Sequence, residues 1–200
     1  MDTANCSDEL LVRSAREGSR EAFDALVRRY QFQAVALTRS ILRNFELAED
    51  ASQNAFAKAY FALAHFREDS KFKTWFFRIL INEAKDVLRR EKVRGLFRFV
   101  RETDREDDES VSILELIPSH DRSPKEALEA EEAKERLDRA IRQLPSREQE
   151  VFILRYLQGL SLAEVAEALG IALGTVKAHL AHGSNKLKSI LLSESEEVSK

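Results

Sequence analysis

Residues 160–183 read LSLAEVAEALGIALGTVKAHLAHG, and this stretch decides the fold of the C-terminal part of the chain. Ser161 and Glu164 have the spacing of a capping box, so a helix is predicted to begin at Leu162. Gly170 can adopt the left-handed backbone conformation in which such a helix ends. The stretch therefore predicts a short helix followed by a tight turn.

A second helix is predicted to start at Thr175, with Val176 and Leu180 on its buried side and Lys177 exposed. Two helices around a short turn indicate a helix-turn-helix, whose second helix usually enters the major groove of DNA. An αα-hairpin that only packs is the plainer interpretation. Small Ala166 at the helix crossing, the glycine turn and the exposed polar residues favour DNA binding.

The composition of the 200 residues favours an all-α protein. Three prolines and six glycines are few for an architecture of strands and turns, and period-two alternation is hard to find. Cys6 is the one cysteine, which excludes an internal disulfide and a cysteine-based zinc site. Arg78 breaks the longest apolar run, and the N-terminus shows no secretory signal, so a cytoplasmic protein without membrane insertion is expected.

Charge is distributed unevenly along the chain. The net charge is −3, which by itself argues against nucleic-acid binding. Residues 102–135 hold thirteen acidic and four basic side chains, a local charge of −9, so the remainder carries +6. This asymmetry indicates an acidic segment set between basic modules.

Helical periodicity predicts two small helical domains joined by a flexible acidic linker. The first domain, residues 1–94, is expected to be a helical bundle in which Leu10, Leu11 and Ala15 face inward. Its helices are predicted at 8–16, 22–42, 47–64 and 74–90, with a polar loop, HFREDSKF, at 65–72.

Residues 95–123 show no sustained period and are predicted to be the linker. The second domain, residues 124–200, is expected to contain the helix-turn-helix after two helices, at 124–143 and 145–159. Ser146 and Gln149 have capping-box spacing at the start of the second of these helices.

Four segments in this order resemble the conserved regions of bacterial sigma factors of the extracytoplasmic-function group. They are AREGSREAFDALVRRY (15–30), LAEDASQNAFAKAYFAL (47–63), FREDSKFKTWFFRILINEAKDVLRR (66–90) and AIRQLPSREQEVFILRYLQGLSLAEVAEALGIALGTVK (140–177). The resemblance implies a promoter-specificity subunit that binds core RNA polymerase and directs initiation at −35 and −10 promoter elements. It also implies an inhibitory anti-sigma factor as a partner.

By this resemblance the first domain reads and melts the −10 element. Opened DNA exposes unstacked bases, which need a positive groove with aromatic or polar pockets. Thr74, Arg78 and Asn82 follow one another at four-residue steps, a face that suits contacts to a DNA strand. The residues expected at the −10 element are Phe66, Arg67, Ser70, Lys71, Lys73, Thr74, Arg78 and Asn82.

The resemblance assigns the grip on the polymerase clamp helices to Asp50, Gln53, Asn54 and Phe56. Relatives usually carry an acidic residue where Asn54 stands, and a solvated helix face with Phe56 buried is the plainer interpretation. The resemblance also implies that the linker lies near the active-site channel of the polymerase, where an anionic segment can mimic a nucleic-acid backbone. An ordinary disordered linker would have a similar composition.

The −35 element would be read by the helix that starts near Thr175. The expected contacts are Thr175, Lys177, Ala178, His179, His182 and Lys186. Relatives commonly carry serine where Ala178 stands and arginine at both histidines, so this helix has little positive charge. Gly183 is expected to weaken it by about 1 kcal/mol relative to alanine. No metal site is expected at the histidines, because partner ligands are absent nearby.

Other functions fit parts of the pattern. TVKAHL also resembles the recognition helix of response-regulator effector domains, so a different DNA-binding regulator is one alternative, although no receiver-domain pattern precedes it. A helical adaptor without promoter activity is another, and it need not bind polymerase. An enzyme is not expected and no cofactor is implied, because a lone thiol and scattered histidines form no catalytic set.

Overall fold

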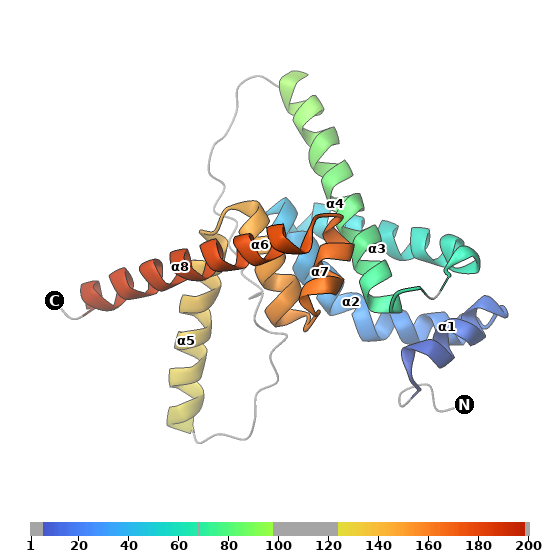
Figure 1. Ribbon diagram of the computed structural model, residues 1–200, viewed down its shortest axis with the longest axis horizontal. Coiled ribbons are helices and arrows are strands. Elements are labelled where there is room, and N and C mark those ends of the chain that lie inside the picture. The colour runs from blue at the N-terminus through green and yellow to red at the C-terminus, as the bar shows by residue number, and fades with distance from the viewer. Residues whose placement is uncertain (1–5, 68, 98–123, 199–200) are drawn as a thin grey trace. The chain divides into compact units, whose positions relative to one another are not determined.

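The computed structural model describes residues 6–67, 69–97 and 124–198, and these residues contain no strand. The elements are α1 (Asp8–Arg16), α2 (Arg20–Leu42), α3 (Phe45–Ala62), η2 (Leu63–His65), α4 (Phe72–Phe97), α5 (Pro124–Arg142), α6 (Ser146–Phe152), η4 (Ile153–Leu157), α7 (Leu162–Leu169) and α8 (Leu173–Val198) (Figure 1). The all-α prediction is confirmed. None of the helices in the described ranges is long and apolar enough to cross a membrane.

The chain divides into two compact units. The first is built from α1, α2, α3, η2 and α4, and the second from α5, α6, η4, most of α7 and α8. Helix α4 continues to Phe97, beyond the boundary predicted after residue 94. Most of the predicted linker, residues 98–123, lies outside the described residues.

Polar caps determine where the first three helices begin. Side chains of the residues that precede them accept hydrogen bonds from backbone N–H groups three positions on, and these cap residues are Ser7, Ser19 and Asn44. Helix α3 therefore starts at Phe45, directly after Asn44, and not at the predicted Leu47. Leu10, predicted to face inward, is 52% exposed, because Leu11, Val12 and Ala15 already fill the buried arc of α1.

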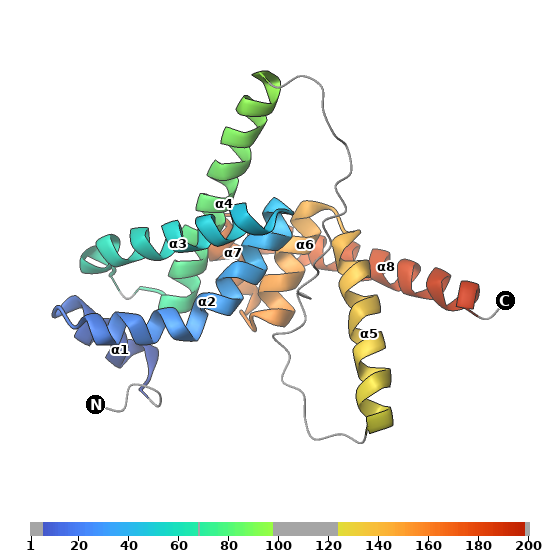
Figure 2. The ribbon, with the colours of Figure 1, turned by 180° about the vertical axis from the view of Figure 1, so that it is seen from behind.

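In the first unit, α2 and α3 pack together and α4 packs against both (Figures 1 and 2). Small residues let α2 and α3 approach closely, and Thr38 Oγ1 lies 2.9 Å from both the Ala48 carbonyl and the Ser52 hydroxyl. Aromatic rings fill the space under α4, where Phe56 stacks on Phe76 at 4.4 Å between centroids. The unit thus has a core of its own.

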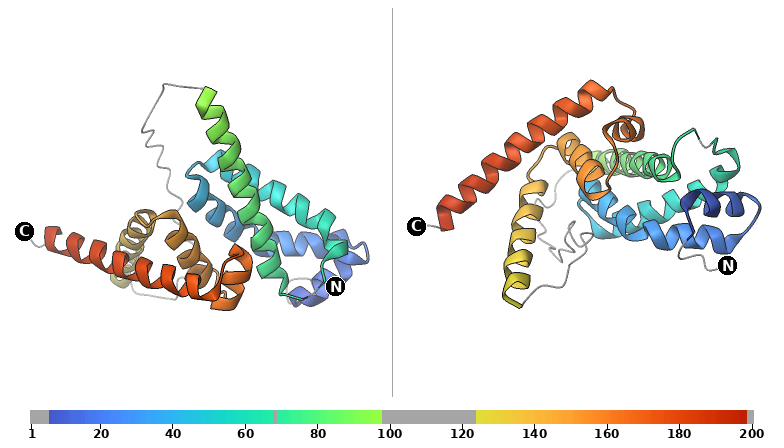
Figure 3. Two further views of the ribbon diagram at one scale, coloured as in Figure 1. Left: turned by 45° about the horizontal axis from the view of Figure 1, so that its top comes forward. Right: turned by 60° about the horizontal axis from the view of Figure 1, so that its bottom comes forward.

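In the second unit, α5 and α6 both pack against the long helix α8 (Figure 3). The predicted capping box is confirmed: Ser161 Oγ accepts from the Glu164 N–H at 3.2 Å, and Glu164 accepts from the Ser161 N–H at 2.7 Å. Gly170 has φ +64° and ends α7, as predicted. Helix α8 starts at Leu173, two residues before the predicted Thr175.

The helix predicted at 145–159 differs from the observed one. Helix α6 starts at Ser146 after Pro145 with no side-chain cap, and Gln149 is buried, so the capping box predicted there is wrong. After α6 the chain makes a π-helical turn, η4, closed by the hydrogen bond from the Gln158 N–H to the Ile153 carbonyl. This wider turn buries both Ile153 and Leu154.

Candidate nucleic-acid interface

The residues predicted for the −10 element lie on the loop before α4 and on the first three turns of α4, and some of them are buried while others are exposed. Phe66 is 6% exposed and lies 4.8 Å from Trp75 between ring centroids, while Phe72 and Phe76 belong to the same aromatic cluster. Phe66 is therefore a buried residue that packs beneath Trp75, and its side chain is not part of the exposed surface. Trp75, half-buried, is the ring of this cluster nearest to solvent.

Thr74 is fully buried, so the prediction that it shares a solvent-facing side with Arg78 and Asn82 is wrong. Arg78 and Asn82 are both exposed. Each four-residue step along an α-helix rotates the face by about 40°, which leaves Thr74 beside buried Ile81. The Thr74 hydroxyl has no hydrogen-bond partner among the described residues.

The remaining residues predicted for the −10 element form a cationic rim. Arg67 and Lys71 are exposed on the loop, Ser70 is half-buried, and the Lys73 ammonium lies 5.9 Å from the centre of the Phe77 ring. Basic groups near the half-buried ring of Trp75 suit the backbone and bases of a single strand. The geometry is therefore compatible with the predicted role of this rim.

Three of the four residues predicted to contact polymerase are exposed on α3. These are Asp50, Gln53 and Asn54. Phe56 is 9% exposed and its ring stacks on Phe76, so its side chain belongs to the core of the first unit. The position of Phe56 agrees with the plainer interpretation, in which α3 has a solvated face and Phe56 is buried.

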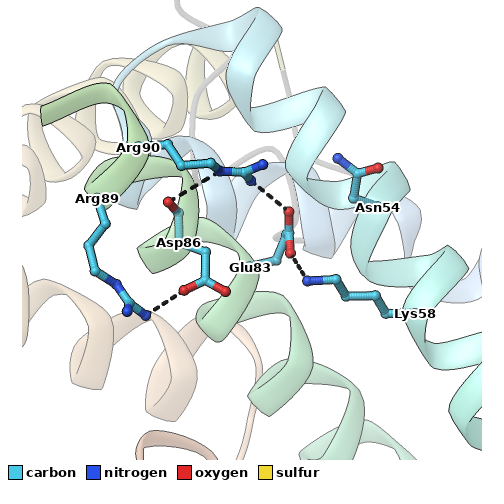
Figure 4. A pocket seen from close by; sticks show the side chains of 6 residues that line it. All are labelled: Asn54, Lys58, Glu83, Asp86, Arg89 and Arg90. Atoms are coloured by element: carbon cyan, nitrogen blue, oxygen red, sulfur yellow. Dashed lines mark hydrogen bonds and ion pairs between the residues drawn. The ribbon is translucent and has the colours of Figure 1, made fainter. Parts of the chain in front are cut away.

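A charged pocket of about 540 Å³ opens between α3 and α4 next to Asn54 (Figure 4). At its centre Glu83, whose side chain is 4% exposed, forms ion pairs with Lys58 of α3 and with Arg90 of α4. The Arg90 guanidinium lies 3.1 Å from Glu83 Oε1, and Asp86 pairs with Arg89 beside it. This network joins α3 to α4 in the pocket that Asn54 also lines (Figure 4).

The predicted −35 residues lie on the N-terminal half of α8. Thr175, Lys177, Ala178 and His182 are exposed, as is Lys186 one turn further on. Val176 is fully buried and anchors the helix, as predicted. The predicted −35 residues other than His179 therefore face solvent, with Lys177 near the beginning of α8.

Among the predicted −35 residues, His179 differs from the rest, because its side chain is only 25% exposed and is paired with a carboxylate. Nδ1 of His179 lies 3.1 Å from Oε1 of Glu148 on α6. Partial burial pushes the pKa of the Glu148 carboxyl upward, but the hydrogen bond with His179, backbone hydrogen bonding and the nearby His182 hold it below its ordinary value. Glu148 is therefore a carboxylate at neutral pH.

The sequence did not point to Glu148 or Glu83, and it marked Gly183 only as a residue that weakens its helix. Glu148 and His179 are 31 residues apart, and no local pattern connects them. Gly183 is buried, and a Cβ there would stand 3.3 Å from Glu148 Cβ, so glycine permits the close approach of α6 and α8. An isolated glycine in a helix was the one signal available for this contact.

Comparisons with known proteins cover both units. Residues 26–94 match the family Sigma-70 region 2, and residues 134–187 match Sigma-70, region 4. RNA polymerase sigma-H factor of Pseudomonas aeruginosa is 35% identical over 173 residues, 86% of this chain and 88% of that protein. ECF RNA polymerase sigma-E factor of Escherichia coli K12 is 34% identical over 174 residues, 87% of this chain and 88% of that protein.

Among solved structures, CnrH in complex with the cytosolic domain of CnrY has a TM-score of 0.61 and 25% identity, covering 93% of this chain and 97% of that one. The two family matches follow one another in a single chain, an order that neither a response regulator nor an adaptor is expected to have. The chain belongs to the extracytoplasmic-function (ECF) group of sigma-70 factors and is a promoter-specificity subunit of RNA polymerase.

Proposed function

We propose that the two units divide the promoter between them: the first unit reads and melts the −10 element, and α8 of the second unit reads the −35 element. The observation that carries this proposal is the set of exposed residues on α8, the second helix of the helix-turn-helix that it forms with α7, with Thr175 and Lys177 at its N-terminal end. In such motifs the N-terminal part of the second helix contacts base edges.

At the −10 element, the contacts are made by Arg67, Lys71, Arg78 and Asn82, which are exposed, together with Ser70 and Lys73. Trp75 offers a half-exposed ring on which an unstacked base can lie. Phe66 and Thr74 act from beneath this surface, since both are buried.

Polymerase binds the exposed face of α3 formed by Asp50, Gln53 and Asn54, supported from behind by Phe56 and by the Glu83 ion pairs. The acidic segment 102–135, with a local charge of −9 against −3 for the whole chain, lies near the active-site channel of the polymerase. The polymerase performs the chemistry of transcription and the chain itself performs none. The complex acts in the cytoplasm, together with RNA polymerase.

An anti-sigma factor is the partner that holds the chain inactive. The similar chain CnrH is bound to the cytosolic domain of CnrY, which supports a protein partner for a chain of this fold. Co-purification of the tagged chain from its own host, followed by competition with core polymerase, tests this proposal. A captured protein that leaves polymerase binding unchanged is not such an inhibitor.

A reconstituted transcription assay tests the promoter-reading proposal. Core polymerase, the folded chain and a library of randomised promoter sequences should give start sites enriched in two conserved blocks, one near −35 and one near −10. Transcription without enrichment of any sequence, with polymerase binding intact, would contradict the proposal.

A further inference from the structure

We propose that Glu148 determines the base preference of the chain at one position of the −35 element by holding the ring of His179 in a single tautomer. This inference rests on the proposed function, in which α8 reads the −35 element. It adds a specificity residue that lies outside the reading helix, on α6.

The geometry gives His179 one fixed orientation. Its Nδ1 lies 3.1 Å from Glu148 Oε1, and Glu148 is itself confined, because its side chain is 14% exposed and its Cβ packs against Gly183 of α8. The other ring nitrogen, Nε2, makes no hydrogen bond to the described part of the chain and is not buried. Nε2 is therefore the nitrogen that a DNA base can reach.

The partner of Nδ1 decides which nitrogen carries the hydrogen. A carboxylate can only accept, so Nδ1 of His179 must donate. A neutral imidazole has one N–H group, and with that hydrogen on Nδ1 the Nε2 atom presents a lone pair. Glu148 thus makes His179 an acceptor toward the DNA.

An acceptor in the major groove distinguishes between bases. Adenine presents its N6 amino group there and cytosine its N4 amino group, whereas guanine and thymine present acceptors on the corresponding edge. The base facing His179 is therefore adenine or cytosine. An arginine at this position could only donate and would favour guanine, so the His179–Glu148 pair presents the opposite hydrogen-bond polarity to the base.

Glu148→Gln tests the inference, because glutamine keeps the carbon atoms that pack on Gly183 but can accept through its oxygen or donate through its amide. Both tautomers of His179 then become possible. Glu132→Gln is the matched control, since Glu132 is an exposed carboxylate of the same unit on α5. The readout is the base preference at each −35 position, measured with core polymerase and a randomised library at about pH 8, where free histidine is neutral.

The unmodified chain should favour adenine or cytosine over guanine and thymine at one position by on the order of fivefold, the value of one net hydrogen bond. Glu148→Gln should reduce this ratio toward one at that position alone, and Glu132→Gln should leave it unchanged. His179→Ala should abolish the same preference, and adding Glu148→Gln to it should have no further effect.

Three results would overturn the inference. The first is an unchanged preference in Glu148→Gln when His179→Ala removes it. The second is a His179-dependent preference for guanine or thymine in the unmodified chain, and the third is a His179→Ala profile identical to that of the unmodified chain. Absence of any −35 preference in the unmodified chain would instead contradict the proposed function, so the two failures are distinguishable.

Discussion

At the scale of the residue, Tyr30 shows how one hydrogen bond ties α1 to α2. Its hydroxyl donates to Asp8, which also pairs with Arg29. Burial, the hydrogen bond to Asp8 and the charge of that carboxylate all raise the pKa of Tyr30 above its ordinary value. In the unfolded chain the phenol ionises near pH 10.

The stability of the first unit should therefore depend on this phenol at high pH. A group whose pKa is raised by folding contributes stability that is complete below its unfolded pKa and is lost as pH rises, at up to about 1.4 kcal/mol per pH unit. Tyr30→Phe should flatten the decline in unfolding free energy above about pH 10. Urea unfolding followed by Trp75, the one tryptophan of the chain, measures this decline. Exposed Tyr60→Phe is the control, and equal slopes in both variants would refute the argument.

Gly183 is a second residue whose role depends on its neighbour. Alanine should strengthen an exposed helix position by about 1 kcal/mol relative to glycine. A Cβ at Gly183 would meet Glu148 Cβ at 3.3 Å, however, and that atom can move only with α6. We expect Gly183→Ala to give none of this gain and to increase hydrogen exchange of the α6 and α8 amides. Gly174→Ala, where a Cβ meets nothing within 4 Å, is the matched control, and equal protection in both would contradict this.

At the scale of the element, α3 and α4 are joined through Glu83. Its carboxylate is buried while the Lys58 and Arg90 side chains are 56% and 59% exposed, so loss of the acid and loss of a base are not equivalent. Glu83→Gln should cost about 1–3 kcal/mol in unfolding free energy, because a charged acceptor for two cations is lost. Lys58→Ala should cost less than about 1 kcal/mol, since one partner remains. Urea unfolding followed by Trp75 fluorescence checks both, and equal costs would contradict this asymmetry.

The elements that the sequence predicts correctly are those with local signals. The Ser161–Glu164 box and the left-handed Gly170 depend on residues within one turn, so α7 and its end are predicted well. Burial within a helix depends on what packs against it. The predictions that Leu10 is buried and that Thr74 is exposed are therefore wrong, since helical spacing does not determine which residues at the edge of a helix face contact the core. The pairing of His179 with Glu148 is purely tertiary and has no local signal.

At the scale of the whole molecule, the charge distribution separates affinity from selectivity. The chain carries −3 overall, and nonspecific duplex binding requires many cationic contacts with phosphates, so the free chain should bind DNA weakly. We expect polymerase to supply most of the contacts that hold DNA in the complex. Helix α8 then needs only a few selective contacts, which is consistent with its single exposed cation in the first two turns, Lys177.

Lys177→Ala should therefore weaken use of the −35 element and leave polymerase binding intact. We expect roughly tenfold weaker transcription from promoters that depend on the −35 element, the equivalent of about 1.4 kcal/mol, because one cationic contact to DNA is lost. Affinity for core polymerase should remain unchanged, since the proposed polymerase surface lies on α3 in the other unit. Competitive polymerase binding and transcription from a matched promoter pair measure the two effects. Lys188→Ala removes the same charge from an exposed position further along α8 and should reproduce neither effect. Equal losses of polymerase binding and transcription in Lys177→Ala would show that the two functions are not carried by separate units.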